Sequence, residues 1–112
     1  AALRERVHRT LADVDALLVP ATMIPARPLA SIDASVESYS DANVRYLRNT
    51  AVGNILALCA VVLPCGFTRE GLPIGLMIYA KPLDEAMALR VARAYEQATD
   101  WHRRRPDLSW AR

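Results

Sequence analysis

Few residues of this chain combine the types and the spacing that catalysis requires. The two histidines, His8 and His102, stand near opposite ends of the sequence without partners at metal-ligand spacing, and each lies in an arginine-rich segment. Cys65 precedes Gly66, but no residue close to it in the sequence offers the base that would activate a thiol nucleophile. We therefore interpret the histidines as surface residues and Cys65, like Cys59, as a buried small hydrophobe.

The motifs of several large enzyme classes are also absent from the sequence. No Gly-x-Ser-x-Gly turn is present to hold a serine nucleophile, and neither the Gly-x-Gly-x-x-Gly pattern nor the P-loop occurs. Asp84 and Glu85 form an adjacent carboxylate pair, but a helix is expected to begin there, and helix capping explains both. The sequence therefore predicts no catalytic residue, no metal site and no cofactor within these 112 residues.

Length and charge narrow the possible classes further. A chain of 112 residues is at most one domain, so residues 1–112 are expected to form a single domain or a fragment of one. The net charge of +2, from 14 basic and 12 acidic residues, is too balanced to indicate a nucleic-acid partner. We interpret the run from Arg103 to Arg105 as a solvated helix end in preference to a nucleic-acid patch. No apolar run approaches the ~20 residues that a membrane span needs.

The spacing of apolar residues predicts the elements of the first half. Apolar residues recurring every three or four positions predict a helix over residues 2–13. The continuous apolar run 16–19, ended by Pro20, predicts a strand that is covered on both faces. Three prolines then indicate an irregular loop over residues 20–40, a length that is uncommon unless the loop is functional or packs on an absent surface.

The second half is predicted to contain a hairpin between two helices. The elements are a helix capped by Ser40 or Asp41 and running to about Ala57, strands over 60–65 and 73–80, and a helix from Asp84 to about His102. The strands pair most simply as an antiparallel hairpin at about 60–80. The order α-β-loop-α-β-β-α indicates part of an α/β layered fold.

Both helices of the second half are predicted to carry an apolar stripe on one face. The expected stripes are Val44, Leu47, Ala51, Asn54, Ile55 and Leu58 in the first helix, and Met87, Val91, Ala94, Tyr95 and Ala98 in the second. Gly53 lies inside the first helix, where glycine costs up to ~1 kcal/mol relative to alanine, so we expect another element to pack closely against it.

Several short motifs follow one another in a fixed order along the chain. They are Asp-Ala-Leu-Leu-Val-Pro at 15–20, Thr50 with Asn54, Pro-Cys-Gly-Phe at 64–67, Gly-Leu-Pro-Ile-Gly at 71–75, Asp84 with Glu85, and Ala92 with Glu96. This order resembles the C-terminal part of the amidase signature family over essentially the whole chain. The resemblance implies that the chain is the C-terminal part of the α/β core of that family.

The resemblance also implies an activity for a longer protein. Amidase signature enzymes cleave carboxylic amides with a serine nucleophile, a second serine in a cis peptide and a lysine. In the family these three groups precede the part seen here, and Lys81, the only lysine, does not match the catalytic lysine motif. No catalytic residue is therefore assigned to this chain, which we expect to be inactive alone.

The resemblance implies a passive role in the site for one helix. The C-terminal part of the family supplies one wall of the acyl pocket, and here the helix around Thr50, Asn54 and Leu58 is the segment that would face substrate. The alternative is that Thr50 and Asn54 only satisfy buried backbone groups.

The expected partners follow from these interpretations. They are the N-terminal catalytic portion of the same protein, a second copy in a homodimer, and a small-molecule amide as the substrate of the longer enzyme, with no nucleic acid and no membrane. Two cysteines without a CxxC pattern indicate a reduced, cytoplasmic protein. Two alternatives remain: a standalone interaction or dimerisation module, and part of an A-type subunit of a glutamyl-tRNA amidotransferase, which adds RNA and which the near-neutral charge does not favour.

Overall fold

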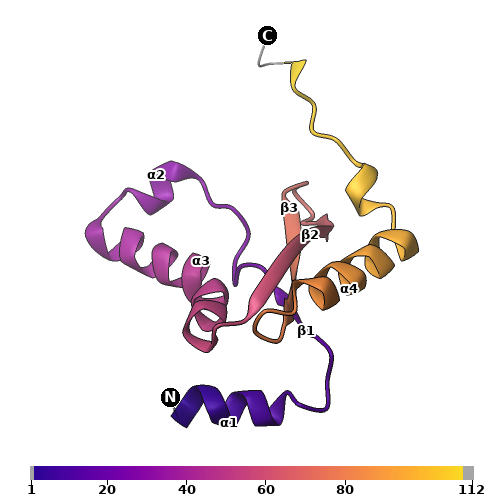
Figure 1. The fold of residues 1–112 in the computed structure, drawn as a ribbon. Helices are drawn as coiled ribbons and strands as arrows, with labels where there is room; N and C mark the ends of the chain where they lie inside the picture. Colours follow the sequence, from indigo (N-terminus) through magenta and orange to yellow (C-terminus); the bar gives the residue numbers. More distant parts are fainter. Residues whose placement is uncertain (1, 110–112) are drawn as a thin grey trace.

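The computed structural model describes residues 2–109 and has the element order that the sequence predicts (Figure 1). The elements are α1 (Ala2–Thr10), β1 (Leu17–Pro20), α2 (Leu29–Ile32), α3 (Val36–Leu56), β2 (Cys59–Phe67), β3 (Pro73–Ala80), α4 (Glu85–Ala98) and a short 3-10 helix at Trp101–Arg103. The prediction of an α/β fold is confirmed, and the added elements are α2, a single turn inside the predicted loop, and the short 3-10 helix after α4.

The strands form one antiparallel sheet in the order β1-β3-β2. β2 and β3 make the predicted hairpin, with Val61 opposite Ile78, and β1 lies on the other side of β3, with Leu17 opposite Tyr79. The register shifts between Pro64 and Gly66, so the proline lies next to a bulge in an edge strand, where a residue without an N–H is tolerated. β3 is thus the only strand of this sheet with a neighbour on both sides.

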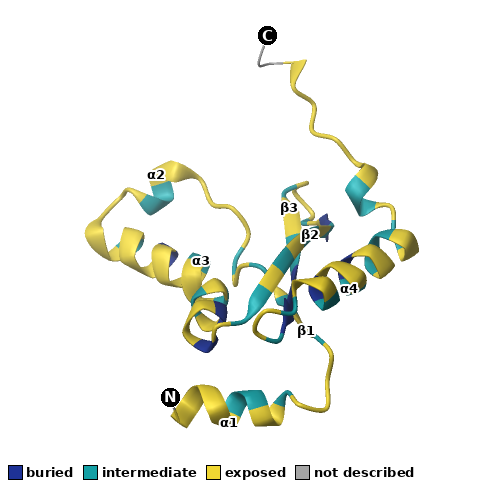
Figure 2. Ribbon diagram, in the orientation of Figure 1, coloured by how far each residue is buried: buried dark blue, intermediate teal, exposed yellow. Residues whose placement is uncertain are grey.

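The core is small and centres on β3. α3 and α4 lie on opposite sides of the sheet (Figure 1), and successive residues of β3 point to opposite faces, so Ile78 and Tyr79 reach different sides. Ile78 is fully buried, and Ala88 and Ala92 are the buried residues of α4. Burial is concentrated in β3, at the end of α3 and on the inner side of α4 (Figure 2).

The long helix α3 begins earlier than predicted. Its cap is Ser35, whose Oγ accepts a hydrogen bond from the Ser38 amide at 3.1 Å, and not Ser40 or Asp41. Asp41 instead pairs with Arg45 at 2.9 Å within the helix. An N-cap serine accepts a hydrogen bond from the backbone amide three residues later, as Ser35 does from Ser38. The prolines that indicated the loop end at Pro28, so the helix can begin before residue 40.

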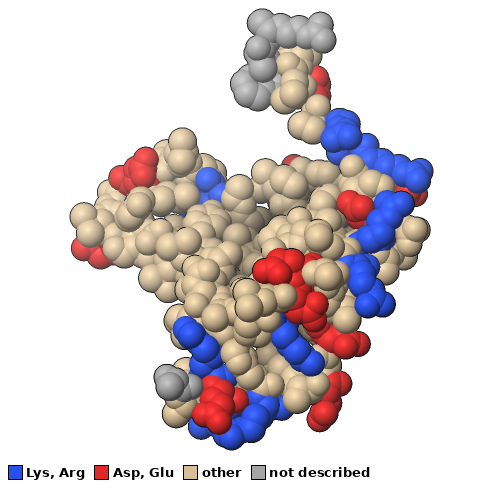
Figure 3. Space-filling model, viewed as in Figure 1, with Lys and Arg blue, Asp and Glu red and all other residues tan. Residues whose placement is uncertain are grey.

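The predicted apolar stripe of α3 is largely exposed in this chain. Val44 is 64% exposed, Leu47 52% and Ile55 60%, whereas the buried residues of α3 are Ala42, Gly53 and Leu56. The helix therefore meets the rest of the chain along a narrow line of mostly small residues. Its outer side belongs to the broad uncharged surface that spans α2, α3 and the sheet in Figure 3.

The strand β1 is also less covered than predicted. A strand buried on both faces was expected, but Leu17 is 38% exposed and Leu18 49%. The end of β1 and the loop that follows it are fixed to α3 by polar contacts: Asn49 Nδ2 donates to Pro20 O at 2.8 Å, and Tyr46 Oη donates to Pro25 O at 3.1 Å. The continuous apolar run thus predicted the strand correctly but not how far the strand is buried.

The last helix is capped as predicted but ends sooner. Asp84 accepts a hydrogen bond from the Met87 amide at 3.2 Å, and α4 ends at Ala98, not near His102. Of the predicted stripe, Ala94 and Ala98 are exposed, because the helix turns its Ala88 and Ala92 side to the sheet.

The arginine run after α4 contacts its own chain. Arg103 pairs with Asp100 at 3.4 Å, and the guanidinium of Arg104 lies 5.2 Å from the ring centre of Trp101 and 5.5 Å from that of Phe67. Such stacking is favourable at exposed sites. These contacts agree with the interpretation of the run as a solvated helix end.

Candidate functional site

The candidate site lies at the C-terminal end of α3, where the chain reverses into β2. Asn54 and Leu58 line the same open cavity of about 520 Å³. Its other lining residues are Gly53, Ala57, Cys59, Pro82, Leu83 and Glu85. Two of the three residues predicted for a pocket wall therefore share one cavity, while Thr50 is not among its lining residues.

The polar groups of the predicted wall behave differently from one another. Thr50 Oγ1 donates to Leu47 O at 2.9 Å, so this hydroxyl satisfies a carbonyl of its own helix. Asn54 is exposed, and its side-chain amide makes no hydrogen bond within residues 2–109. The amide of Asn54 is consequently free to bind a ligand group, whereas the hydroxyl of Thr50 is engaged.

Tyr79 supports this end of α3 from the sheet. Its ring lies against Gly53, and its hydroxyl donates to Asn49 O at 2.6 Å. Burial raises the pKa of Tyr79 above its usual value of 10.0, and a hydrogen bond with the Gly53 backbone partly offsets this. The phenol is therefore a neutral structural donor, and sequence analysis missed it because an aromatic residue in a strand carries no sign of a polar contact.

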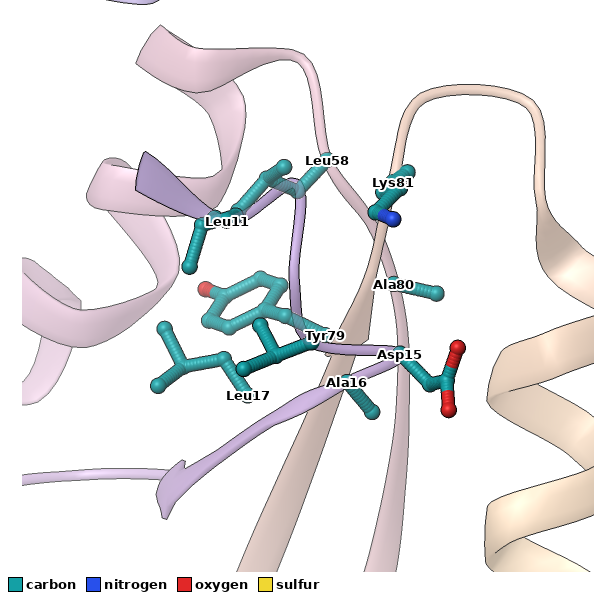
Figure 4. A pocket seen from close by; sticks show the side chains of 9 residues that line it. Leu11, Asp15, Ala16, Leu17, Leu58, Tyr79, Ala80 and Lys81 are labelled. Atoms are coloured by element: carbon teal, nitrogen blue, oxygen red, sulfur yellow. The ribbon is translucent and has the colours of Figure 1, made fainter. Parts of the chain in front are cut away.

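A second, much smaller cavity shares the lining residue Leu58 with the first. Its volume is about 10 Å³, near the least that one water molecule needs. Figure 4 shows the Tyr79 ring reaching in between Leu11, Leu17 and Leu58. Leu58 lines both cavities, so it connects the open wall to the apolar side chains of Leu11, which follows α1, and Leu17 of β1.

The cysteines are less buried than predicted. Cys59 and Cys65 are both free and only half-buried. Cys59 Sγ donates to Lys81 O at 3.1 Å, and burial raises the pKa of the Cys65 thiol above 9.0. A raised pKa makes a thiol a poorer nucleophile at neutral pH, so the structure supports a packing role for Cys65.

The histidines are not simple surface residues. His8 is half-buried, and its Nε2 donates to Leu56 O at 2.9 Å. His102 is also half-buried, and its Nδ1 is buried without a hydrogen-bond partner. The surface interpretation is therefore wrong for both, and for His8 the reason is a contact between residues far apart in sequence.

Other chemical groups in the described part of the chain serve the fold. Lys81 Nζ donates to Ala12 O at 3.0 Å and so holds the segment after α1. Residues 2–109 contain no cluster of three side chains suited to a metal ion, and no helix among them has the length and hydropathy of a membrane span.

The chain matches the model of a known protein family. The model of the family described as Amidase matches residues 1–89, most of the chain. The chain belongs to the amidase family. Its helix α3, its hairpin and the start of α4 all lie within the matched region.

Individual relatives within and around the family agree. The chain is 42% identical over 108 residues to an A-type subunit of glutamyl-tRNA(Gln) amidotransferase from Myxococcus xanthus, covering 95% of this chain and 21% of that protein. It is 36% identical over 115 residues to an amidase of Pseudomonas putida, covering 95% of this chain and 24% of that protein. The chain therefore spans about a fifth of the length of the relatives that it matches.

A solved structure has the same fold. The structure of a 6-aminohexanoate cyclic dimer hydrolase superposes with a TM-score of 0.81 and 28% identity over 96% of this chain and 24% of that one. The α3 end, the hairpin and α4 are thus an arrangement that also occurs inside a much longer hydrolase.

Proposed function

We propose that this chain is the C-terminal segment of an amidase that hydrolyses carboxylic amides, and that it is inactive without the preceding part of the protein. The observation that carries the proposal is the superposition on the 6-aminohexanoate cyclic dimer hydrolase over 96% of this chain and 24% of that one. The match to the Amidase family supports the same reaction class. Residues 1–112 are then one region of a larger amidase domain.

The reaction belongs to the missing catalytic portion. A serine oxygen there would attack the amide carbonyl, the C–N bond would break, and a proton would pass to the departing ammonia or amine. Backbone N–H groups would stabilise the oxyanion, and water would then release the carboxylic acid from the serine ester. The described residues would contribute shape and polarity to the acyl pocket.

We propose the end of α3 as that pocket wall. Asn54 and Leu58 line a single open cavity, one offering an amide and the other an apolar surface. Thr50 lies one turn earlier on the same helix, with its hydroxyl bound to Leu47 O, so its methyl group is the part that would face an acyl chain. A small-molecule amide is the substrate class that this wall suits.

The test requires the longer reading frame. DNA upstream of the Ala1 codon would be sequenced, the full frame expressed, and ammonia release measured on a panel of aliphatic, aryl and cyclic amides. We expect turnover by the long protein, none by residues 1–112, and a raised KM for Asn54→Ala. A long protein that is folded and hydrolyses no amide would overturn the proposal.

A second function is favoured by the degree of identity. The chain is 42% identical to an A-type subunit of glutamyl-tRNA(Gln) amidotransferase and 36% identical to an amidase over similar lengths. The alternative is therefore an amidotransferase component, in which ammonia from an amide is passed to an acceptor and not lost to water. Glutamine-dependent amidation of glutamate esterified to tRNA, measured with the long protein and its partner subunits, distinguishes this function from simple hydrolysis.

The exposed apolar stripe of α3 supports the proposal that another protein surface binds to this chain. Val44, Leu47 and Ile55 form an apolar surface that is costly to leave in water. We propose that the catalytic portion of the same protein covers it, and that residues 1–112 alone form a homodimer. The two free cysteines support a reducing, cytoplasmic location.

Sedimentation velocity at micromolar concentration, with a dye that binds exposed apolar surface, tests the proposed partners. A monomer that binds no dye would contradict both the absent catalytic portion and the dimer. If the chain forms a stable dimer and the gene contains no longer reading frame, the standalone interaction module would be favoured.

A further inference from the structure

The helix α1 is held to the end of α3 mainly by polar contacts. α1 lies beside the C-terminal end of α3 (Figure 1), and none of its residues is buried. Arg4 Nε and Nη2 donate to Ile55 O at 3.0 and 2.8 Å, and His8 Nε2 donates to Leu56 O at 2.9 Å. Both side chains thus come from about fifty residues away to bind the last carbonyls of another helix.

With these contacts, each of the last four carbonyls of α3 has a hydrogen-bond donor. The last four carbonyls of a helix have no partner within the helix. Here Gly53 O accepts from the Leu58 amide at 3.0 Å and Asn54 O accepts from the Ala57 amide at 3.3 Å. The remaining two carbonyls, those of Ile55 and Leu56, are the ones that Arg4 and His8 bind.

The residue that reverses the chain is under strain. Ala57 has φ 57° and ψ 37°, in the left-handed region that glycine usually occupies at this position. It follows directly after the two carbonyls that α1 binds and precedes Leu58, which lines both cavities. The reversal is therefore fixed on one side by α1 and determines where the wall residue Leu58 lies.

We propose that Arg4 and His8 are positioning residues of the pocket wall. They complete the cap of α3 from outside the helix and hold the strained turn at Ala57, which places Asn54 and Leu58 along the cavity. The positive guanidinium of Arg4 also complements the negative end of the α3 dipole. The role in a pocket rests on the proposed amidase function, whereas the cap itself does not depend on any activity.

Hydrogen exchange in the 112-residue chain tests the cap directly. The Ala57 and Leu58 amides close the α3 turn, so we expect Arg4→Ala to lower their protection about tenfold, the usual effect of losing a charged hydrogen bond. His8→Ala should lower it less, and His8→Gln, which keeps an N–H donor, should restore it. Unchanged protection at both amides in Arg4→Ala would overturn the proposal.

Two further variants separate positioning from general loss of structure. Arg9→Ala is the matched control, because Arg9 is on the same helix and, among residues 2–109, its side chain pairs only with the exposed Glu5, at 3.4 Å. Ala57→Gly relieves the strained turn, so adding it to Arg4→Ala should recover most of the lost protection. Arg4→Ala that loses protection evenly over α3, β3 and α4, with no recovery by Ala57→Gly, would show a structural role only and contradict positioning.

Kinetics of the long protein test the link to the pocket. We expect Arg4→Ala to raise KM for an amide about fivefold with a smaller change in kcat, since about 1 kcal/mol of positioning corresponds to that factor, and Ala57→Gly to restore KM. A lowered kcat at constant KM would contradict a role in the wall. A long protein without amide turnover would overturn the proposed function, while the exchange result would still decide whether α1 caps α3.

Discussion

The ring of Tyr79 occupies the space that a side chain at Gly53 would need. A Cβ at residue 53 would lie 2.7 Å from Tyr79 Oη and 2.8 Å from Tyr79 Cζ, closer than real contacts allow. The ring cannot easily move away, because Tyr79 is only 4% exposed and its hydroxyl is bound to Asn49 O at 2.6 Å. One glycine in a long helix thus allows the sheet to support the end of α3.

Gly53→Ala is expected to destabilise the chain although alanine favours helix. The gain in helix propensity is about 1 kcal/mol, and the clash with a buried ring costs typically 1–3 kcal/mol, so we expect a net loss of up to about 2 kcal/mol. The midpoint of urea unfolding measures it. Tyr79→Leu in the same chain removes the opposing ring, and the double variant should lose less than the two single variants added together.

Tyr79 is expected to make the fold sensitive to alkaline pH. Burial raises the pKa of its phenol in the folded state above 10.0, so the folded state retains the proton longer than the unfolded state. The contribution is complete below pH 10 and is lost as the pH rises through the folded pKa. Unfolding followed from pH 8 to 12 should show stability falling above pH 10, and Tyr79→Phe should flatten that fall. An equally steep fall in Tyr79→Phe would assign it to other groups.

Asp84 is expected to stabilise α4 through its cap alone. Its Oδ1 accepts from the Met87 amide at 3.2 Å, and losing such a cap costs about 1 kcal/mol, so Asp84→Ala should lower the free energy of unfolding by that amount. Asp84→Asn keeps an acceptor and serves as the matched control, with an expected loss of no more than a few tenths of a kcal/mol. Equal losses in the two variants would point to charge and not to capping.

Cys65 is expected to react slowly with thiol reagents near neutral pH. Burial raises the pKa of its thiol above 9.0, so less thiolate is present at pH 7 to 8 than in a free cysteine. Labelling with iodoacetamide, followed by mass spectrometry of the peptides, measures this rate, and the difference from glutathione should shrink as the pH rises above 9. Cys65→Ser shows which part of the signal belongs to Cys59. A rate above that of glutathione at pH 7 would contradict the packing role.

The sequence predicted the elements well because their signals are local. The hairpin over 60–80, the cap at Asp84 and the close contact at Gly53 each follow from a few neighbouring residues, and each is confirmed. The start of α3 was misplaced because several serines near residue 35 all suit a cap, and only the backbone geometry selects Ser35.

The faces of the helices were harder to predict, for a different reason. Apolar stripes indicate which side of a helix avoids water, but they do not say what covers that side, and Val44, Leu47 and Ile55 are exposed in this chain. The buried side of α3 is marked by Ala42 and Gly53, small residues that periodicity does not identify. The contacts of Arg4 and His8 join residues about fifty positions apart, and no local pattern indicates such a pair.

The order of strands in the sheet also has a kinetic consequence. β2 and β3 are joined by a short connection, so their hairpin can form on the microsecond timescale of isolated hairpins. β1 joins the opposite edge of β3 only after a closure of about sixty residues, between Leu17 and Tyr79, and such long-range pairing is slow. We therefore expect the hairpin to form early and the first twenty or so residues to dock last. During synthesis β1 would thus remain unpaired until β3, its partner strand, has left the ribosome.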